Sequence, residues 1–216
     1  MSAAARADAF VALARTKVVP VVRTSSAELA AAAVDALAAA GFTVFEITLT
    51  IPGALDVIRA LAGRDGVQVG VGTVTDAAMA RQSIAAGARF LVSPCVLPEV
   101  VGPAHDAGLP VLLGAMTPTE VLAAARAGAD GVKVFPASSA GGAAHVKALR
   151  SIFPAIPLVP TGGIAQDQVR AYLDAGAAFV GMGGRLVDEG LLAGGRAEEM
   201  TALGRQLRAS LGLDAG

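Results

Sequence analysis

One lysine lies inside an apolar run at residues 130–136, which read Asp-Gly-Val-Lys-Val-Phe-Pro. If this run is a β-strand, Val132 and Val134 share one face, and Lys133 and Phe135 share the other. A buried ammonium group is costly, and a lysine that has lost its proton in such a place is a nucleophile toward carbonyl carbon. The run therefore indicates a Schiff-base lysine. The alternative is an ordinary lysine at a strand end, whose amine reaches water.

The alternation of side chains along a second predicted strand places a carboxylate on the same side as Lys133. In the predicted strand at residues 44–49, one face is apolar, with Phe45, Ile47 and Leu49. The other face carries Val44, Glu46 and Thr48, and Thr50 continues it just beyond the strand. Polar side chains near the carboxyl ends of barrel strands are typical of active sites. We expect Glu46 to lie in the same interior as Lys133. The alternative is a structural carboxylate that pairs with an arginine.

Further polar residues and glycines follow other predicted strands. They are Arg23, Thr73, the Ser93-Pro94 step, Thr161-Gly162-Gly163 and Gly181-Met182-Gly183-Gly184. Glycine turns that expose backbone N–H groups just before a helix can bind phosphate, and the last two units of a barrel are where such sites occur. The alternatives are a turn or cap for Thr73, a solvated cation for Arg23, and tight packing for the glycines. Because all these residues end strands, we expect them to gather on one rim.

The elements that would hold these residues alternate between short β-rich runs and longer Ala- and Leu-rich runs. Eight strands are predicted, at residues 18–22, 44–49, 67–71, 90–92, 111–113, 131–135, 158–160 and 179–182. Helices are predicted at residues 26–40, 53–62, 76–86, 98–107, 118–127, 143–152 and 166–175. Five of these helices end in an Ala-Gly step, where glycine can adopt the left-handed conformation that closes a helix.

Eight such units predict an α/β fold of the (β/α)8, or TIM, barrel type. A doubly wound open sheet is the alternative, but no Gly-x-Gly-x-x-Gly follows the first strand and no P-loop is present. No linker interrupts the chain, so residues 1–216 are expected to form a single domain. Within it, residues 1–16 would form an N-terminal helix, residues 18–190 the barrel and residues 195–212 a closing helix.

Composition excludes several classes of partner. The chain has 17 Lys+Arg against 18 Asp+Glu, and so lacks the basic excess that favours nucleic acid or an anionic membrane surface. Although 54% of residues are hydrophobic, no apolar segment reaches the length of about 18 residues that spans a membrane. The single cysteine and two histidines leave no disulfide or zinc cluster, and with no secretory signal a cytoplasmic location is expected. His105 lies in a helical run and is expected to be solvated.

In order and spacing, five segments resemble the family of 2-keto-3-deoxy-6-phosphogluconate (KDPG) and 4-hydroxy-2-oxoglutarate (KHG) aldolases, class I enzymes. The segments are Glu46-Ile47-Thr48-Leu49-Thr50, Gly70-Val71-Gly72-Thr73-Val74, Val92-Ser93-Pro94, Val132-Lys133-Val134-Phe135-Pro136 and Pro160-Thr161-Gly162-Gly163-Ile164. The resemblance extends over nearly the whole barrel. It implies reversible cleavage of KDPG, a small-molecule substrate, to pyruvate and glyceraldehyde 3-phosphate. It also implies no metal or other cofactor, and a homotrimer.

The resemblance further implies roles for single residues. Lys133 would form the Schiff base, and Glu46 would transfer protons, through a bound water, during carbinolamine formation and carbon–carbon cleavage. Other substrate contacts would come from Thr50, Thr73, Pro94, Phe135 and Thr161, and the phosphate would be held by Gly162, Gly163, Gly183 and Gly184.

Two positions depart from the family pattern. Many members have an arginine where Thr50 stands, which binds the substrate carboxylate, and many have a serine where Gly184 stands. We expect Arg23 to bind the carboxylate instead, because a guanidinium can form two hydrogen bonds with it. Thr161 favours the gluconate substrate, whereas residues 137–142 resemble the enzymes for the galactonate epimer.

The alternatives left open are of three kinds. The substrate could be the galactonate epimer or a nonphosphorylated 2-keto-4-hydroxy acid. The chain could be a phosphate-binding isomerase or synthase, which would not need a lysine on the sixth strand. It could also be a noncatalytic barrel that binds a sugar phosphate. The pairing of Lys133 with Glu46 argues against the last, since an unused buried lysine costs stability.

Overall fold

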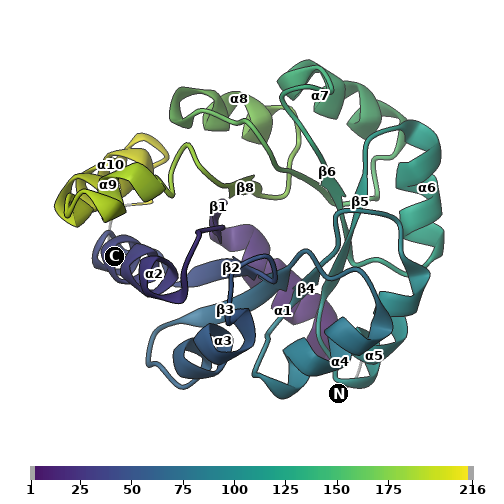
Figure 1. Ribbon diagram of the computed structural model, residues 1–216. Helices are drawn as coiled ribbons and strands as arrows, with labels where there is room; N and C mark the ends of the chain where they lie inside the picture. The colour runs from purple at the N-terminus through teal and green to yellow at the C-terminus, as the bar shows by residue number, and fades with distance from the viewer. Residues whose placement is uncertain (1–2, 214–216) are drawn as a thin grey trace.

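The computed structural model describes residues 3–213, and its centre is a barrel of parallel strands (Figure 1). The eight strands are β1 (Val18–Val22), β2 (Val44–Thr48), β3 (Gln68–Gly72), β4 (Leu91–Val92), β5 (Val111–Ala115), β6 (Gly131–Val134), β7 (Leu158–Pro160) and β8 (Val180–Met182). Hydrogen-bonded neighbours follow the order β7-β6-β5-β4-β3-β2-β1-β8, and an isolated parallel bridge between Thr161 and Gly181 joins the two ends of this sheet. The predicted (β/α)8 barrel is confirmed.

The helices surround the barrel, apart from the first, which lies across one end of it (Figure 1). They are α1 (Ala3–Arg15), α2 (Ala27–Ala39), α3 (Ala54–Ala62), α4 (Ala77–Ala85), α5 (Val101–Asp106), α6 (Pro118–Arg126), α7 (Gly142–Ile152), α8 (Val169–Asp174), α9 (Glu189–Ala193) and α10 (Ala197–Ser210). Two short 3-10 helices, η1 (Pro98–Val100) and η2 (Gln166–Gln168), precede α5 and α8. Within residues 3–213, no helix combines the length and the apolar character needed to cross a membrane.

Strand alternation produces two separate apolar cores. Phe45 and Val132 belong to the outer core, which lies between the strands and the surrounding helices. Val44 belongs to the inner core, where side chains from the barrel interior meet Phe10 and Leu13 of α1. Burial of these two α1 side chains contributes roughly 1.5–3 kcal/mol each. Because α1 closes one end of the barrel, the interior is accessible from the carboxyl ends of the strands.

Glycines end helices as the sequence predicts. The left-handed region is occupied, with φ from +72° to +106°, by Gly41, Gly87, Gly108, Gly128 and Gly176. Two predicted helices, residues 98–107 and 166–175, begin as 3-10 turns. Helix α9 has no counterpart among the predicted helices, because its five residues are too few to display a helical period.

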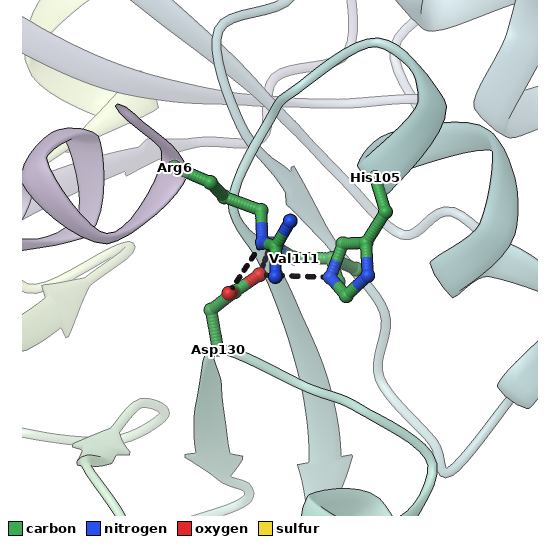
Figure 2. A network of polar contacts seen from close by, with 4 residues as sticks. All are labelled: Arg6, His105, Val111 and Asp130. Atoms are coloured by element: carbon green, nitrogen blue, oxygen red, sulfur yellow. Dashed lines mark hydrogen bonds and ion pairs between the residues drawn. The ribbon is translucent and has the colours of Figure 1, made fainter. Parts of the chain in front are cut away.

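A polar network fastens α1 to the barrel at the amino end of β6 (Figure 2). Asp130 Oδ1 accepts a hydrogen bond from Arg6 Nε at 2.8 Å. Its Oδ2 accepts from the Val111 backbone N–H at 3.0 Å and lies 3.2 Å from His105 Nε2. The expectation that His105 is solvated is therefore wrong: its side chain is 25% exposed and contacts Asp130, because residues 101–106 pack beside the start of β5.

Candidate active site

Two ionisable side chains meet inside the barrel. Lys133 projects from β6 and Glu46 from β2, and 3.5 Å separates Lys133 Nζ from Glu46 Oε1. Each residue is only 4% exposed. Alternation accounts for this placement, since the neighbours of Lys133 along the strand, Val132 and Val134, lie in the outer core.

The Glu46 carboxylate has unused capacity to accept a proton. Its Oε1 is buried and has no hydrogen-bond partner within residues 3–213. The 3.5 Å to Lys133 Nζ is an ion-pair distance, longer than the usual hydrogen bond of 2.7–3.2 Å. An unsatisfied buried carboxylate oxygen costs stability, and such groups are concentrated at functional sites.

An aromatic ring covers the lysine on one side. Phe135 places its ring centroid 5.2 Å from Lys133 Nζ, within the range of a cation–π contact. The peptide bond between Phe135 and Pro136 is cis. The ring takes the place of water beside the amine and forms part of the wall against which an organic substrate can pack.

A cavity of about 440 Å³ opens beside Lys133. The residues singled out from the sequence that line it are Arg23, Lys133, Phe135, Thr161, Gly162, Gly163, Gly183 and Gly184. Val21, Ile164 and Arg185 complete the wall. Arg185 was not among the site residues predicted from the sequence. Its position directly after the Gly183-Gly184 step places it on the predicted rim. The sequence does not show, however, whether the side chain of a rim arginine points into the cavity.

Arg23 and Thr73 lie together at this rim. Arg23 Nη2 donates a hydrogen bond to Thr73 Oγ1 at 3.4 Å, across the end of the intervening strand β2. Thr73 has φ of +63°, a conformation that is rare for a β-branched residue and costs roughly 1–3 kcal/mol. Such strain is concentrated at ligand-binding sites, and here it holds the hydroxyl toward Arg23.

Four expected residues do not line the cavity: Glu46, Thr50, Thr73 and Pro94. Glu46 and Thr73 contact residues that do line it, Lys133 and Arg23 respectively. Thr50 is exposed, and its Oγ1 lies 2.9 Å from Thr48 Oγ1, while Pro94 follows β4 outside the cavity wall. Thr50 is held there because the chain leaves β2 at Thr48 and turns toward α3. Among residues 3–213, no three His, Cys, Asp or Glu side chains gather in a way that could hold a metal ion.

Two glycine turns, which follow the last two strands β7 and β8, form part of the cavity wall. Gly162 and Gly163 follow β7 with φ of +100° and +73°. A Cβ on Gly163 would lie 2.0 Å from Ser138 Oγ, so only glycine allows the two loops to approach so closely. Neither turn leads directly into a helix, because η2 begins at Gln166 and α9 at Glu189. The helix predicted from residue 166 does begin there, with two residues between it and Gly163, and its first turn is 3-10.

Fold and site together define a (β/α)8 barrel with a buried lysine–glutamate pair, whose lysine lines a cavity. Residues 11–203 match the family model described as "KDPG and KHG aldolase". Since this match covers most of the chain, the protein belongs to the KDPG and KHG aldolase family. It is an aldolase, a lyase that acts on carbon–carbon bonds.

Individual relatives agree with this assignment. The chain is 35% identical to the 2-dehydro-3-deoxy-phosphogluconate aldolase of Treponema pallidum, over 91% of this chain and 94% of that protein. It is also 35% identical to a probable 2-dehydro-3-deoxy-6-phosphogalactonate aldolase of Rhizobium meliloti, over 82% of this chain and 84% of that protein. The crystal structure of the KDPG aldolase of Legionella pneumophila, with pyruvate captured as a covalent carbinolamine intermediate, superposes with a TM-score of 0.83. That match has 30% identity and covers 94% of this chain and 97% of the other.

Proposed function

We propose that this protein cleaves KDPG reversibly to pyruvate and glyceraldehyde 3-phosphate through a Schiff base on Lys133. The observation that carries the proposal is the buried pair at 3.5 Å: Lys133 lines the cavity, and Glu46 Oε1 beside it accepts no hydrogen bond from residues 3–213. A structural ion pair would be expected to satisfy both partners by additional hydrogen bonds. This pair leaves the carboxylate available to the substrate.

The first steps use the amine of Lys133. The neutral amine attacks the C2 ketone to give a carbinolamine, which loses water and becomes a protonated imine. Glu46 supplies and removes the protons that these steps require. The positive imine nitrogen then draws electrons from the neighbouring carbons, so that a bond to C3 can break without forming a free carbanion.

Bond cleavage uses Glu46 as a base. The carboxylate takes the proton of the C4 hydroxyl, the C3–C4 electron pair moves into the imine, and glyceraldehyde 3-phosphate leaves as an aldehyde. The remaining enamine takes a proton at C3 to become the imine of pyruvate. Water then hydrolyses that imine, which releases pyruvate and restores Lys133.

Substrate recognition is proposed to divide between two regions of the cavity. Arg23, fixed by Thr73, would bind the carboxylate, with Phe135 and Thr161 around the carbon chain. The Gly162-Gly163 and Gly183-Gly184 turns would offer backbone N–H groups to the phosphate. The galactonate epimer is the second candidate substrate, favoured by the 35% identity to the Rhizobium meliloti relative.

We also propose that the protein is a cytoplasmic homotrimer in which each chain folds as a single domain. The family resemblance supports the trimer, and a single cysteine suits a reducing compartment. Support for a single domain comes from α1, whose Phe10 and Leu13 lie in the inner core. Light scattering of the purified protein tests the trimer, and the expected mass is three times that of the chain.

Borohydride reduction in the presence of pyruvate tests the proposed function. Mass spectrometry of the digested protein is expected to place the reduced adduct on Lys133. The variant Lys133→Met should form no adduct, whereas the control Lys147→Met, which removes an exposed lysine of α7, should retain it. Absence of the reduced pyruvate adduct from Lys133 in folded wild-type protein would contradict the proposal. Pyruvate release from the gluconate and galactonate substrates in parallel then decides between the two epimers.

A further inference from the structure

A third cation lines the cavity, and the proposed function gives it no role. Arg185 follows the Gly183-Gly184 step after β8. It lines the cavity as an exposed side chain, as Arg23 does, whereas Lys133 lines the same cavity but is buried. Among the described residues, this wall contains no Asp or Glu. The Glu46 carboxylate pairs with Lys133, so within residues 3–213 the two arginines are the cations of the wall without a carboxylate partner, and such a concave positive surface attracts anions.

The acidic residues nearest to Arg185 in the chain have other partners. Asp188 Oδ1 caps α9 by accepting a hydrogen bond from the Leu191 backbone N–H at 3.1 Å. Glu189 Oε1 accepts from the Ser25 backbone N–H at 3.1 Å and also from the Ser25 hydroxyl. Arg185 takes part in none of the ion pairs formed within residues 3–213. Its guanidinium therefore has its hydrogen-bond donors available for a ligand.

The backbone beneath this side chain is well fixed. Gly183 O accepts hydrogen bonds from the N–H groups of Leu186 and Val187 at 2.8 and 2.9 Å, which closes a tight turn around Arg185. Arg185 O accepts a further bond from Gln166 Nε2 at 3.4 Å. A Cβ built on Gly184 would meet nothing within 4 Å, so a ligand has room to approach the turn.

The two arginines of the cavity serve different sides of it. Both follow neighbouring strands, since Pro20 of β1 pairs with Met182 of β8, three residues before Arg23 and Arg185 respectively. Arg23, however, extends to Thr73 after β3, away from β8. The bond between Ser25 and Glu189 joins the two loops and so limits changes in their separation. The cavity thus offers one guanidinium on the β3 side and another on the β8 side.

We propose that Arg185 binds the phosphate group of the substrate and makes the cavity select a phosphorylated 2-keto-3-deoxy sugar acid over the same acid without phosphate. A guanidinium suits this task because it can form two parallel hydrogen bonds with phosphate oxygens. The inference rests on the proposed aldolase function for the identity of the substrate, but the binding of a phosphate ester can be measured without catalysis.

Calorimetric titration with glycerol 3-phosphate, which lacks a reactive carbonyl, tests the binding directly at fixed ionic strength. Arg185→Ala should weaken binding by about 10- to 100-fold, and Arg185→Lys should recover part of the loss because it keeps the charge. Arg126→Ala is the charge-matched control: Arg126 is exposed at the carboxyl end of α6, on the opposite face of the barrel, and its loss should leave binding unchanged. Equal binding by wild type and Arg185→Ala would overturn the inference.

Steady-state kinetics then shows whether Arg185 acts on the phosphate group alone or on substrate binding in general. For Arg185→Ala, KM for KDPG should rise by about 10- to 100-fold, while KM for 2-keto-3-deoxygluconate and borohydride trapping of pyruvate stay at wild-type values. A parallel rise in both KM values would overturn the proposed selectivity. If the wild-type protein traps no pyruvate, the proposed function fails by itself, and the titration still decides whether Arg185 binds a phosphate ester.

Discussion

Gly72 leaves open the space that the Glu46 carboxylate occupies: a Cβ on residue 72 would lie 2.0 Å from Glu46 Oε1. Cβ atoms essentially never lie so close to a nonbonded atom, so any larger residue at position 72 must displace the carboxylate. The position of the proposed general base therefore depends on a residue of the neighbouring strand that has no chemistry of its own.

Gly72→Ala is expected to lower kcat by about 10²- to 10⁴-fold, the usual contribution of a general acid–base group. The reason is displacement of Glu46 from Lys133, and the measurement is pyruvate release at saturating substrate. Gly63→Ala serves as control, because Gly63 has φ of −87° and a Cβ there meets nothing within 4 Å. Wild-type kcat in a folded Gly72→Ala protein would contradict this account of how Glu46 is held.

Arg23→Ala is expected to weaken binding of pyruvate and of the substrate by about 10- to 100-fold, since a charge-assisted pair with the carboxylate is lost. Arg23→Lys should recover little, because an ammonium cannot form the paired hydrogen bonds of a guanidinium. Affinity for pyruvate follows from the concentration dependence of borohydride trapping. Unchanged affinity in Arg23→Ala would show that another group binds the carboxylate.

Asp130→Ala is expected to lower the free energy of unfolding by about 2–3 kcal/mol, because Arg6 and the Val111 N–H lose a partly buried partner. Denaturant titration gives this value. Asp130→Asn should cost less, since its amide oxygen can still accept from Val111. Both variants should keep wild-type kcat when folded, since the network lies at the closed end of the barrel. Loss of kcat with undiminished stability would contradict a structural role.

Glu120 is expected to stabilise the protein in a pH-dependent way. Hydrogen bonds from the Met116 and Thr117 backbone N–H groups, and from the Thr117 hydroxyl, hold the pKa of Glu120 below its usual 4.5. Because the folded-state pKa is lowered, the stabilisation is complete above pH 4.5 and is lost as the pH falls through the lowered value. Glu120→Gln should therefore be less stable than wild type at pH 7, and the difference should shrink at lower pH.

The Glu120 carboxylate is exposed to solvent, which limits how much it stabilises the protein. We therefore expect Glu120→Gln to lower the free energy of unfolding by less than about 1 kcal/mol at pH 7. Denaturant titrations at several pH values measure it. Asp65→Asn removes an equally exposed carboxylate from a turn and provides the comparison. A Glu120→Gln deficit that stays constant from pH 7 to low pH would exclude the carboxylate charge as its source.

The sequence was sufficient for the features that depend on local periodicity. Alternation placed Val132 and Val134 in the outer core, and the Ala-Gly steps marked helix ends at which glycine is left-handed. The order of the strands followed from the repeated unit. These properties depend on side-chain direction and backbone conformation over a few residues, which the pattern of residue types records directly.

Features that depend on distant parts of the chain could not be predicted in the same way. His105 contacts Asp130, a residue 25 positions away, only because α5 packs beside β5. The positive φ of Thr73 contradicts the preference of a β-branched residue, and the direction of Arg185 depends on the turn closed by Gly183. The wall of the cavity likewise omits Thr50, Thr73 and Pro94, although all three follow strands on the correct rim.

The bridge between Thr161 and Gly181 constrains which amino-acid substitutions can be combined at these two positions during evolution. A Cβ on residue 181 would lie 2.4 Å from Thr161 Oγ1, so the two positions cannot both carry side chains of that size. Thr161 lines the cavity, and residue 181 helps to close the barrel. A larger residue 181 requires the Thr161 side chain to shift or to become smaller, so mutations at these two sites are expected to be epistatic. A library built for new substrates should randomise both codons together.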